Sequence, residues 1–555
     1  MMATAICSDH ASTDAVYIID SKIKQYEKEI LALKTQRNTY APISRLPPEL
    51  ITRIFECCKE VESMPSRLQY QKPPRWIRCS HVCRLWRTIA LDSPTLWTDL
   101  NFNHFTWIKE TFVRSKMAAL NVALHLIGTP DEASKVQFVK HQVICHGSRL
   151  KDLSLRSTFS AQSDLAEILG SIPRSTSNLQ SLEIAYAQRS QLYAYLPGEC
   201  ICDADKLQHL MITGCGIDWV QHLSNKSALT VLKLHDIPST STISASQFLQ
   251  SLAGMRSIQI LELSNAFPTL ALHDTGIQSR RIPLPKLRVL KLWGCSPETL
   301  GFLFKHIALG AGVYMDIVAN GVDESCFTTF IEEMSSVISS NGSVIHSLRL
   351  LSATSRQLWM TAFSHDPPGV DGEADVLPRN RTAIFSLQLT ISSASSDHPD
   401  MLWINTCAAL PLTWVRKVSW GNSLLLSAET IISCFGALPN LHSLNFSSRY
   451  HDLIKLLQAT HPSSEGTCAK FMFPVLRSLI LQDFVLDDEC LTDLADILIQ
   501  RHEGGLEVEK LVIKQCYGVD VEEINLLSQI VADVVWDGNV LYISSDDDSS
   551  AGDYW

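Results

Sequence analysis

ISRLPPELITRIF, residues 43–55, and CSHVCRLWRTIALDSPTLW, residues 79–97, carry more apolar and aromatic surface than so small a unit can bury alone. Pro47 and Pro48 suit the first turn of a helix, where a missing N–H removes no hydrogen bond. The apolar residues that follow share one broad stripe on that helix: Leu50, Ile51, Ile54 and Phe55. The first stretch therefore predicts an amphipathic helix that needs a partner.

The second stretch predicts another short helix. Its apolar side chains recur at the spacing of one helical face: Cys79, Val82, Trp86 and Ile89. Pro94 disfavours the helical conformation at the residue before it, so we expect this helix to end near Asp92. Two short helices cannot bury both of these faces without a third element or a partner.

In this order, the two stretches resemble an F-box, the helical module that docks onto the Skp adaptor of cullin-based ubiquitin ligases. We expect this module over residues 42–104. The segment 56–77 is longer than in a compact F-box, and we interpret it as a loop insertion, which surface connections tolerate at small entropic cost. The alternative is an ordinary two-helix core fragment that happens to begin with Leu-Pro.

The resemblance implies a set of side chains that bury against the Skp adaptor or support the surface that does. These are Leu46, Pro47, Leu50, Ile54, Val82, Cys83, Trp86, Leu96 and Trp97. The chemistry of ubiquitin transfer is then left to the other subunits of a cullin-RING ligase, so the resemblance implies no catalytic residue and no cofactor in this chain.

Composition limits the class of protein. The chain has 555 residues, of which 46% are hydrophobic and 19% charged, a folded composition long enough for several domains or one repeat array. A formal net charge of -11 argues against nucleic-acid binding. The sequence lacks a secretory segment and any apolar run long enough for a membrane span, so its 16 cysteines are expected to be reduced thiols in the cytoplasm or nucleus.

The segment that precedes residue 42 predicts a helix. Residues 1–14 are small and polar and are expected to be disordered, whereas residues 15–41 are expected to be helical. Apolar residues there alternate spacings of three and four, which is the pattern of a coiled-coil seam: Val16, Ile19, Ile23, Tyr26, Ile30 and Leu33. Two interpretations remain open: self-association through residues 16–33, or a single amphipathic helix packed on its own domain.

The remainder of the chain is repetitive. An LxxLxL pattern recurs with its middle leucine or isoleucine at positions 153, 182, 210, 232, 261 and 290, which are 22 to 29 residues apart. After a weaker segment near Tyr314, the pattern continues at Leu348, Leu387, Val418, Leu444, Leu479 and Leu511. Each repeat predicts a short strand whose alternate apolar residues point inward, followed by a helical segment.

This pattern resembles a degenerate leucine-rich repeat. The resemblance implies an α/β fold in which an N-terminal helical F-box is followed by a solenoid over residues 105–543, with parallel strands inside and helices outside. A less regular α/β layering of the same units is the alternative. Residues 364–381 are interpreted as a polar insertion, and residues 544–555 as an acidic disordered tail.

Catalytic and metal-binding motifs are absent from the sequence. It contains no GxxxxGK[ST] loop, no GxSxG elbow and no HExxH pair. Cysteine and histidine residues do not form a properly spaced set of zinc ligands. We therefore expect a non-catalytic subunit that binds the Skp adaptor and an unknown protein target. A structural or scaffolding protein that does not direct ubiquitination is the alternative function.

Overall fold

The chain folds as two compact units, Met1–Leu207 and Gln208–Trp555. The computed structural model describes residues 5–62, 75–102, 105–129, 132–158, 161–172, 176–186, 194–197, 201–238, 243–267, 270–271, 281–322, 324–351, 357–365, 383–391, 399–421, 426–447, 453–460, 471–486 and 488–539. Residues 1–4, most of the insertion predicted at 56–77, most of the polar segment 364–381 and the tail 544–555 lie outside these ranges.

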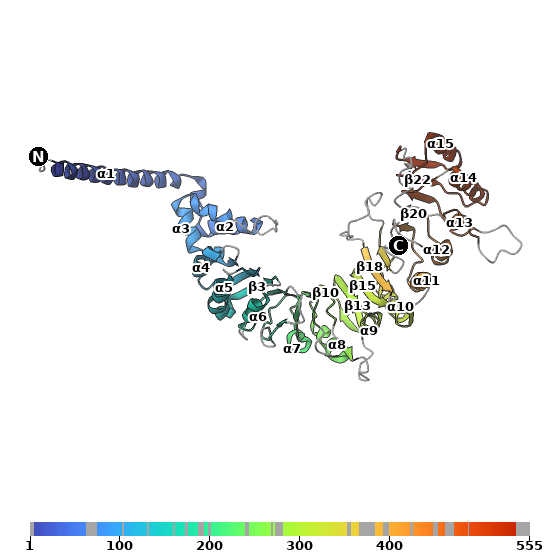
Figure 1. Cartoon of the computed structure of the whole chain (residues 1–555), viewed down its shortest axis with the longest axis horizontal. Coiled ribbons are helices and arrows are strands. Elements are labelled where there is room, and N and C mark those ends of the chain that lie inside the picture. Colours follow the sequence, from blue (N-terminus) through green and yellow to red (C-terminus); the bar gives the residue numbers. More distant parts are fainter. Residues whose placement is uncertain are drawn as a thin grey trace. The chain divides into compact units, whose positions relative to one another are not determined.

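The N-terminal unit begins with helices and continues as strands that alternate with helices (Figure 1). Its elements are α1 Ala5–Thr39, η1 Pro42–Arg45, α2 Pro48–Glu62, η2 Arg75–His81, α3 Arg84–Asp92, η3 Pro94–Trp97, β1 Asp99–Asn101, α4 Phe105–Arg114, β2 Leu120–Leu126, α5 Glu132–Phe138, the π-helical turn η5 Val139–Val143, η6 Ile144–Arg149, β3 Leu150–Ser157, α6 Gln162–Leu169, β4 Ser181–Tyr186 and β5 Ala194–Tyr195.

The helical segments differ from the sequence prediction in three places. The helix α1 begins at Ala5, so it includes most of the segment predicted to be disordered, and α2 continues to Glu62, into the predicted insertion. Cys79 and Val82 precede the second helix instead of lying on its face. The cause is the Cys83 thiol, which accepts a hydrogen bond from the Trp86 N–H at 3.5 Å and starts α3 as its N-cap.

The strands β1, β2, β3 and β4 pair in parallel in chain order. The repeat leucines Leu153 on β3 and Leu182 on β4 lie opposite each other, as Leu155 and Ile184 do. These side chains are at most 2% exposed. The parallel strands that the repeat pattern predicts are therefore present in this unit.

The C-terminal unit alternates strands with helices throughout. Its elements are β6 His209–Thr213, β7 Cys215–Gly216, α7 Trp219–Leu223, β8 Val231–His235, β9 Ile243–Ser244, α8 Ala245–Gly254, β10 Ile260–Ser264, β11 Leu270–Ala271, β12 Ile282–Leu284, β13 Val289–Cys295, α9 Pro297–His306, β14 Ile307–Leu309, β15 Tyr314–Val322, α10 Glu324–Ser340, β16 Ser347–Leu351, β17 Gln357–Phe363, β18 Ala383–Ile391, α11 Pro399–Ala409, β19 Lys417–Trp420, α12 Ala428–Phe435, β20 Ser443–Ser447, α13 Leu453–Gln458, β21 Ser478–Gln482, α14 Asp488–Glu503, β22 Lys510–Lys514, α15 Val521–Ile530 and β23 Asp533–Trp536.

A long, mostly parallel sheet runs through this unit. The strands β6, β8, β10, β13 and β15 pair in parallel in chain order, and so do β16 and β19 to β23. The repeat leucines stay in register from strand to strand: Leu210, Leu232, Leu261 and Leu290 pair in turn. Each is at most 1% exposed. Every second side chain along these strands therefore points to the buried face of the sheet.

The order of strands departs from the predicted repeat series between β15 and β19. β18 pairs in parallel with β15, and β17 lies antiparallel between β18 and β16. After β15, the chain therefore leaves two strand positions empty and forms β16. It then turns back, and β17 and β18 fill those two positions. The sequence pattern missed this hairpin because Leu358, Met360 and Ala362 on β17, all at most 2% exposed, do not follow the LxL repeat.

The helices of the C-terminal unit form a row along one face of this sheet. α9 contacts α10, α10 contacts α11, and the series continues to α15 (Figure 1). Polar N-caps begin many of these helices: Ser244 accepts a hydrogen bond from the Gln247 N–H at 3.2 Å, and Ser296 accepts one from the Thr299 N–H. The predicted arrangement of strands with helices on one side is present in this unit.

Arg501 on α14 holds together the elements near it. Its side chain is fully buried, and its guanidinium donates hydrogen bonds to the carbonyl oxygens of Leu457, Met472 and Phe473 at 2.9 to 3.2 Å. Burial lowers the pKa of Arg501 to about 10, which still leaves it charged at neutral pH. One side chain therefore satisfies the end of α13 and the backbone that leads to β21.

Replacing Arg501 with methionine is expected to destabilise the C-terminal unit by about 3 kcal/mol, because buried carbonyl oxygens lose a charged donor. Urea unfolding followed by circular dichroism measures this change. Gln500→Met is the matched control, since Gln500 is exposed on the same helix. An unfolding midpoint for Arg501→Met equal to that of the control would show that these hydrogen bonds contribute nothing to stability.

Candidate functional site

The apolar stripe of α2 is divided between the core and the surface. Ile51 and Phe55 are at most 1% exposed, whereas Leu50 is 51% and Ile54 is 38% exposed. Successive residues of a helix lie about 100° apart, so one sector of the stripe packs inward and the neighbouring sector remains uncovered. The part that the fold leaves uncovered is the part available to another protein.

The second helix shows the same division. Ile89 and Ala90 of α3 are buried, whereas Leu85 is 44% exposed and Val82, just before the helix, is 62% exposed. Single exposed apolar residues are ordinary on protein surfaces. Leu50, Ile54, Val82 and Leu85, which we call the exposed apolar set, are unusual because they come from two short helices that pack against each other and from the residues just before the second helix.

Aromatic contacts form the core beneath the exposed apolar set. The ring of Phe55 meets that of Trp86 edge-on at a centroid distance of 5.3 Å, and Trp76 meets Trp97 in the same way at 5.1 Å. The indole N–H of Trp97 donates to the Ala90 carbonyl oxygen at 2.7 Å. This core fixes the positions of α2 and α3 relative to each other.

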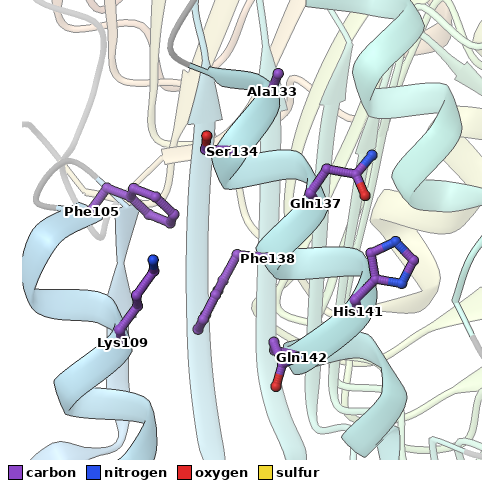
Figure 2. Close-up of a pocket in the computed structure, with 8 residues that line it drawn as sticks. All are labelled: Phe105, Lys109, Ala133, Ser134, Gln137, Phe138, His141 and Gln142. Atoms are coloured by element: carbon purple, nitrogen blue, oxygen red, sulfur yellow. The ribbon is translucent and has the colours of Figure 1, made fainter.

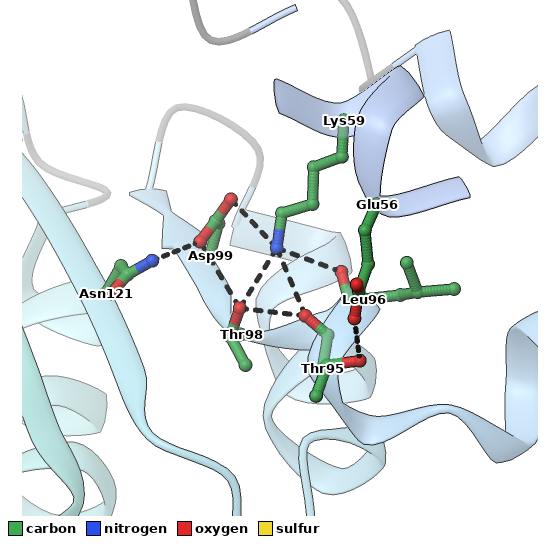
Figure 3. A network of polar contacts seen from close by, with 7 residues as sticks. All are labelled: Glu56, Lys59, Thr95, Leu96, Thr98, Asp99 and Asn121. Atoms are coloured by element: carbon green, nitrogen blue, oxygen red, sulfur yellow. Dashed lines mark hydrogen bonds and ion pairs between the residues drawn. The ribbon is translucent and has the colours of Figure 1, made fainter. Parts of the chain in front are cut away.

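A lysine on α2 joins this core to the first strands (Figure 3). The Lys59 ammonium lies 3.0 Å from the Asp99 carboxylate and donates to the Leu96 carbonyl oxygen and to Thr98 Oγ1. Asp99 also accepts a hydrogen bond from Asn121 of β2 at 2.7 Å. The Lys59 side chain is 14% exposed and that of Asp99 is 43% exposed, and this network links α2 to β1 and β2.

The residues that the sequence assigned to the site fall into three groups. Pro47, Leu50, Ile54 and Val82 are exposed; Leu46, Cys83 and Trp86 are half-buried; Leu96 and Trp97 are at most 2% exposed. Leu85 is exposed as well, although the sequence pattern did not indicate it. The apolar spacing in the sequence assigned Val82, Trp86 and Ile89 to one helical face, and Leu85 lies outside that face. The structure shows that the helix starts at Arg84 and that Leu85 is exposed.

The residues described above fall within a stretch that matches a known protein family. Residues 43–103 match the F-box-like family. This stretch contains the exposed apolar set and the aromatic core beneath it. No curated protein matched the chain in a search of such proteins. The chain therefore carries an F-box-like domain, followed by a large mixed α/β region.

A second candidate surface lies on the face of the C-terminal sheet that points away from the repeat leucines. Glu262 of β10 pairs in register with Lys233 of β8 and Lys291 of β13. Its carboxylate lies 3.4 Å from Lys233 Nζ and 3.4 Å from His235 Nε2, and it is only 8% exposed. We call Glu262, Lys233, His235 and Lys291 the Glu262 cluster. It is a group of two lysines and a histidine around one glutamate, and its basic side chains are 23% to 29% exposed.

Aromatic side chains accompany the Glu262 cluster. The Lys291 ammonium lies 5.1 Å from the ring centroid of Trp293, which is half-buried. Trp359 on β17 is also half-buried, and its indole N–H donates to Ser386 Oγ at 3.1 Å. Next to Lys291, burial raises the pKa of Asp316. Partly exposed Trp and Lys side chains on a rigid sheet are suited to binding a protein, and this group contains no evident nucleophile.

The pocket in Figure 2 has a volume of about 500 Å³ and lies between α4 and α5 of the N-terminal unit. Phe105 and Phe138 meet edge-on in its wall, with centroids 5.9 Å apart. Its remaining described lining residues are Lys109, Ala133, Ser134, Gln137, His141 and Gln142. Among these described residues, His141 has no carboxylate beside it.

Three cysteines lie in the core, where their thiols contact the backbone. Cys215, Cys295 and Cys516 are at most 3% exposed, and each thiol contacts a backbone carbonyl oxygen. Burial raises the pKa of Cys295 to about 12 and that of Cys516 to about 11, so both stay protonated. Within the described residues, no group of His, Cys, Asp and Glu could hold a metal ion, and no helix is suited to span a bilayer.

Substituting Leu50 and Ile51 separately distinguishes the two sectors of α2. Ile51→Ala is expected to destabilise the F-box-like domain by about 3 kcal/mol, because it leaves a cavity in the core. Leu50→Ala is expected to change stability by less than about 0.5 kcal/mol, because the side chain is half in water already. Amide hydrogen exchange of α2 measures both. Equal effects of the two substitutions would contradict this division of the helix.

Proposed function

We propose that this chain is the target-binding, non-catalytic subunit of a Skp-cullin-F-box ubiquitin ligase in the cytoplasm or nucleus. The F-box-like domain binds the Skp adaptor, and the C-terminal region binds a protein target. The observation that carries this proposal is the coincidence of the family match at residues 43–103 with the exposed apolar set, which lies within the same residues.

Within the F-box-like domain, the proposal assigns two roles. Leu50, Ile54 and Val82, together with Pro47 and the added Leu85, contact the adaptor, because their apolar surfaces are in water in the free chain. Burial of such side chains at an interface contributes roughly 1.5 to 3 kcal/mol each. Leu96 and Trp97 support that surface from the core, and the half-buried Leu46, Cys83 and Trp86 lie at its edge.

The C-terminal region is proposed to be a degenerate leucine-rich-repeat solenoid. The in-register burial of leucines along the parallel strands supports this, as does the row of helices on one side of the C-terminal sheet. The hairpin of β16 and β17 is a departure from a regular repeat. A solenoid of this kind presents a broad, rigid surface, which suits recognition of a folded protein better than that of a small molecule.

The target is proposed to bind the sheet face that carries the Glu262 cluster, Trp293 and Trp359. Tryptophan is enriched among the few residues that dominate binding energy at protein interfaces. The half-buried rings are already ordered, Trp359 by its hydrogen bond to Ser386, so little side-chain entropy is lost when a partner covers them. The chain then acts by holding its target near the transferase subunits.

The adaptor interaction is tested by co-purification of the full chain with purified Skp adaptor. Leu50→Asp and Val82→Asp are each expected to weaken binding by about 2 kcal/mol or more, about thirtyfold, because they place a charge in an apolar interface. Val113→Asp on α4 is the matched control. It makes the same apolar-to-acid change at a side chain that is 71% exposed outside residues 43–103.

Circular dichroism establishes that each variant is folded before binding is compared. Adaptor binding that persists unchanged in folded Leu50→Asp and Val82→Asp would overturn the proposed docking surface. Wild-type chain that binds the adaptor while the complex recruits no cullin would instead favour the scaffolding function.

The target surface is tested by protein half-lives in cells that express the chain. Proteins whose half-lives lengthen when the chain is deleted are candidate targets, and wild-type chain is expected to restore their turnover. The combined Trp293→Ala and Trp359→Ala variant is expected to restore it poorly while still binding the adaptor. Trp414→Ala is the control, since Trp414 is 55% exposed outside the strands. Equal rescue by both variants would place target binding elsewhere.

A further inference from the structure

The seam of α1 is uncovered along its whole length. The helix runs from Ala5 to Thr39, and its seam residues are 48% to 66% exposed: Val16, Ile19, Ile23, Tyr26, Ile30 and Leu33. A helix packed on its own domain would bury this face. Of the two interpretations that the sequence leaves open, the exposure of the seam therefore favours a partner from outside the unit.

The residue types along the seam indicate how many helices it joins. With Val16 in position a of a heptad, the a positions are Val16, Ile23 and Ile30, and the d positions are Ile19, Tyr26 and Leu33. β-branched residues at a together with leucine at d favour a two-stranded parallel coiled coil, whereas isoleucine at both a and d favours more strands. Here every a position is β-branched, and the three d positions differ, with leucine only at Leu33. We therefore take two strands, the smallest assembly that covers the seam.

The charges that flank the seam indicate the partner and its direction. In a parallel pair, a g residue of one helix faces the e residue of the next heptad on the other. Lys22 at g then faces Glu27 at e, and Glu29 at g faces Lys34 at e. Every such pair of charged residues is complementary when the partner is a second copy of the same helix.

An antiparallel pair would lose part of this complementarity. It brings e positions against e positions, and Asp20 and Glu27 are both acidic. We propose that α1 forms a parallel, in-register coiled coil with α1 of a second copy of this chain. The helix ends at Thr39, directly before η1 and α2, so the dimer holds two F-box-like domains at the same end of the coil. The proposal does not rest on adaptor binding.

The seam is tested by sedimentation equilibrium of the full chain over a range of concentrations, because a coil shorter than three heptads dimerises weakly. Ile23→Asp combined with Ile30→Asp is expected to raise the dimer dissociation constant at least about 100-fold. The matched control combines Ile18→Asp and Leu31→Asp, which change exposed apolar residues of the same helix at positions c and b. Circular dichroism checks that both variants keep their helix.

The direction of the helices is tested by exchanging charges. Lys22→Glu is expected to weaken the dimer about threefold to tenfold, because the introduced carboxylate then faces Glu27 of the second copy. Adding Glu27→Lys to this variant is expected to restore the affinity, since the pair is complementary again. An antiparallel dimer would not be restored, because positions 22 and 27 do not face each other in it. The effect is expected to shrink at high salt.

A chain that stays monomeric at all concentrations, or that forms a trimer, would overturn the proposal. So would equal weakening by the seam variant and its control. Adaptor binding measured on the same seam variant separates this inference from the proposed function: the variant is expected to bind the adaptor as a monomer, and loss of binding in Leu50→Asp leaves the dimer unchanged.

Discussion

Burial of alternate side chains along parallel strands in constant register is the constraint on which the C-terminal fold depends. Leu232, Leu261 and Leu290 lie side by side on neighbouring strands, with their side chains out of water. A slip of one residue would send a leucine to the other face and bring a charged residue inside. The same register places Lys233, Glu262 and Lys291 together on the opposite face, so the core determines the composition of the proposed target surface.

The F-box-like domain meets a different constraint. Its core is small, and the aromatic pairs around Phe55 and Trp97 fill it, so α2 and α3 can each bury only one sector of their apolar residues. The uncovered sector is therefore a consequence of size. Lys59 secures this domain to β1 and β2, which lets the exposed residues occupy fixed positions although the domain itself is short.

Periodic features of this chain were predictable from its sequence, and features that depend on single contacts were not. The leucine spacing predicted parallel strands with helices between them, and the Leu-Pro and Trp motifs predicted the F-box-like domain. The start of α3 depends on the Cys83 cap, which shifted Val82 off the helix and turned Leu85 outward. The strand β17 was not predictable because its sequence lacks the repeat motif. Its position is determined by burial between its two neighbouring strands.

Exposed apolar residues alone do not identify a binding surface, and this chain contains isolated examples such as Met117 and Trp414. What distinguishes α1 is that its apolar residues recur with one period, while the charged e and g pairs beside them are all complementary when a second copy packs in parallel. Hydrophobic burial supplies affinity without direction, whereas the flanking charges penalise wrong alignments. Because α1 leads directly into the F-box-like domain, the direction of its pairing determines whether two such domains lie together or at opposite ends of the coil.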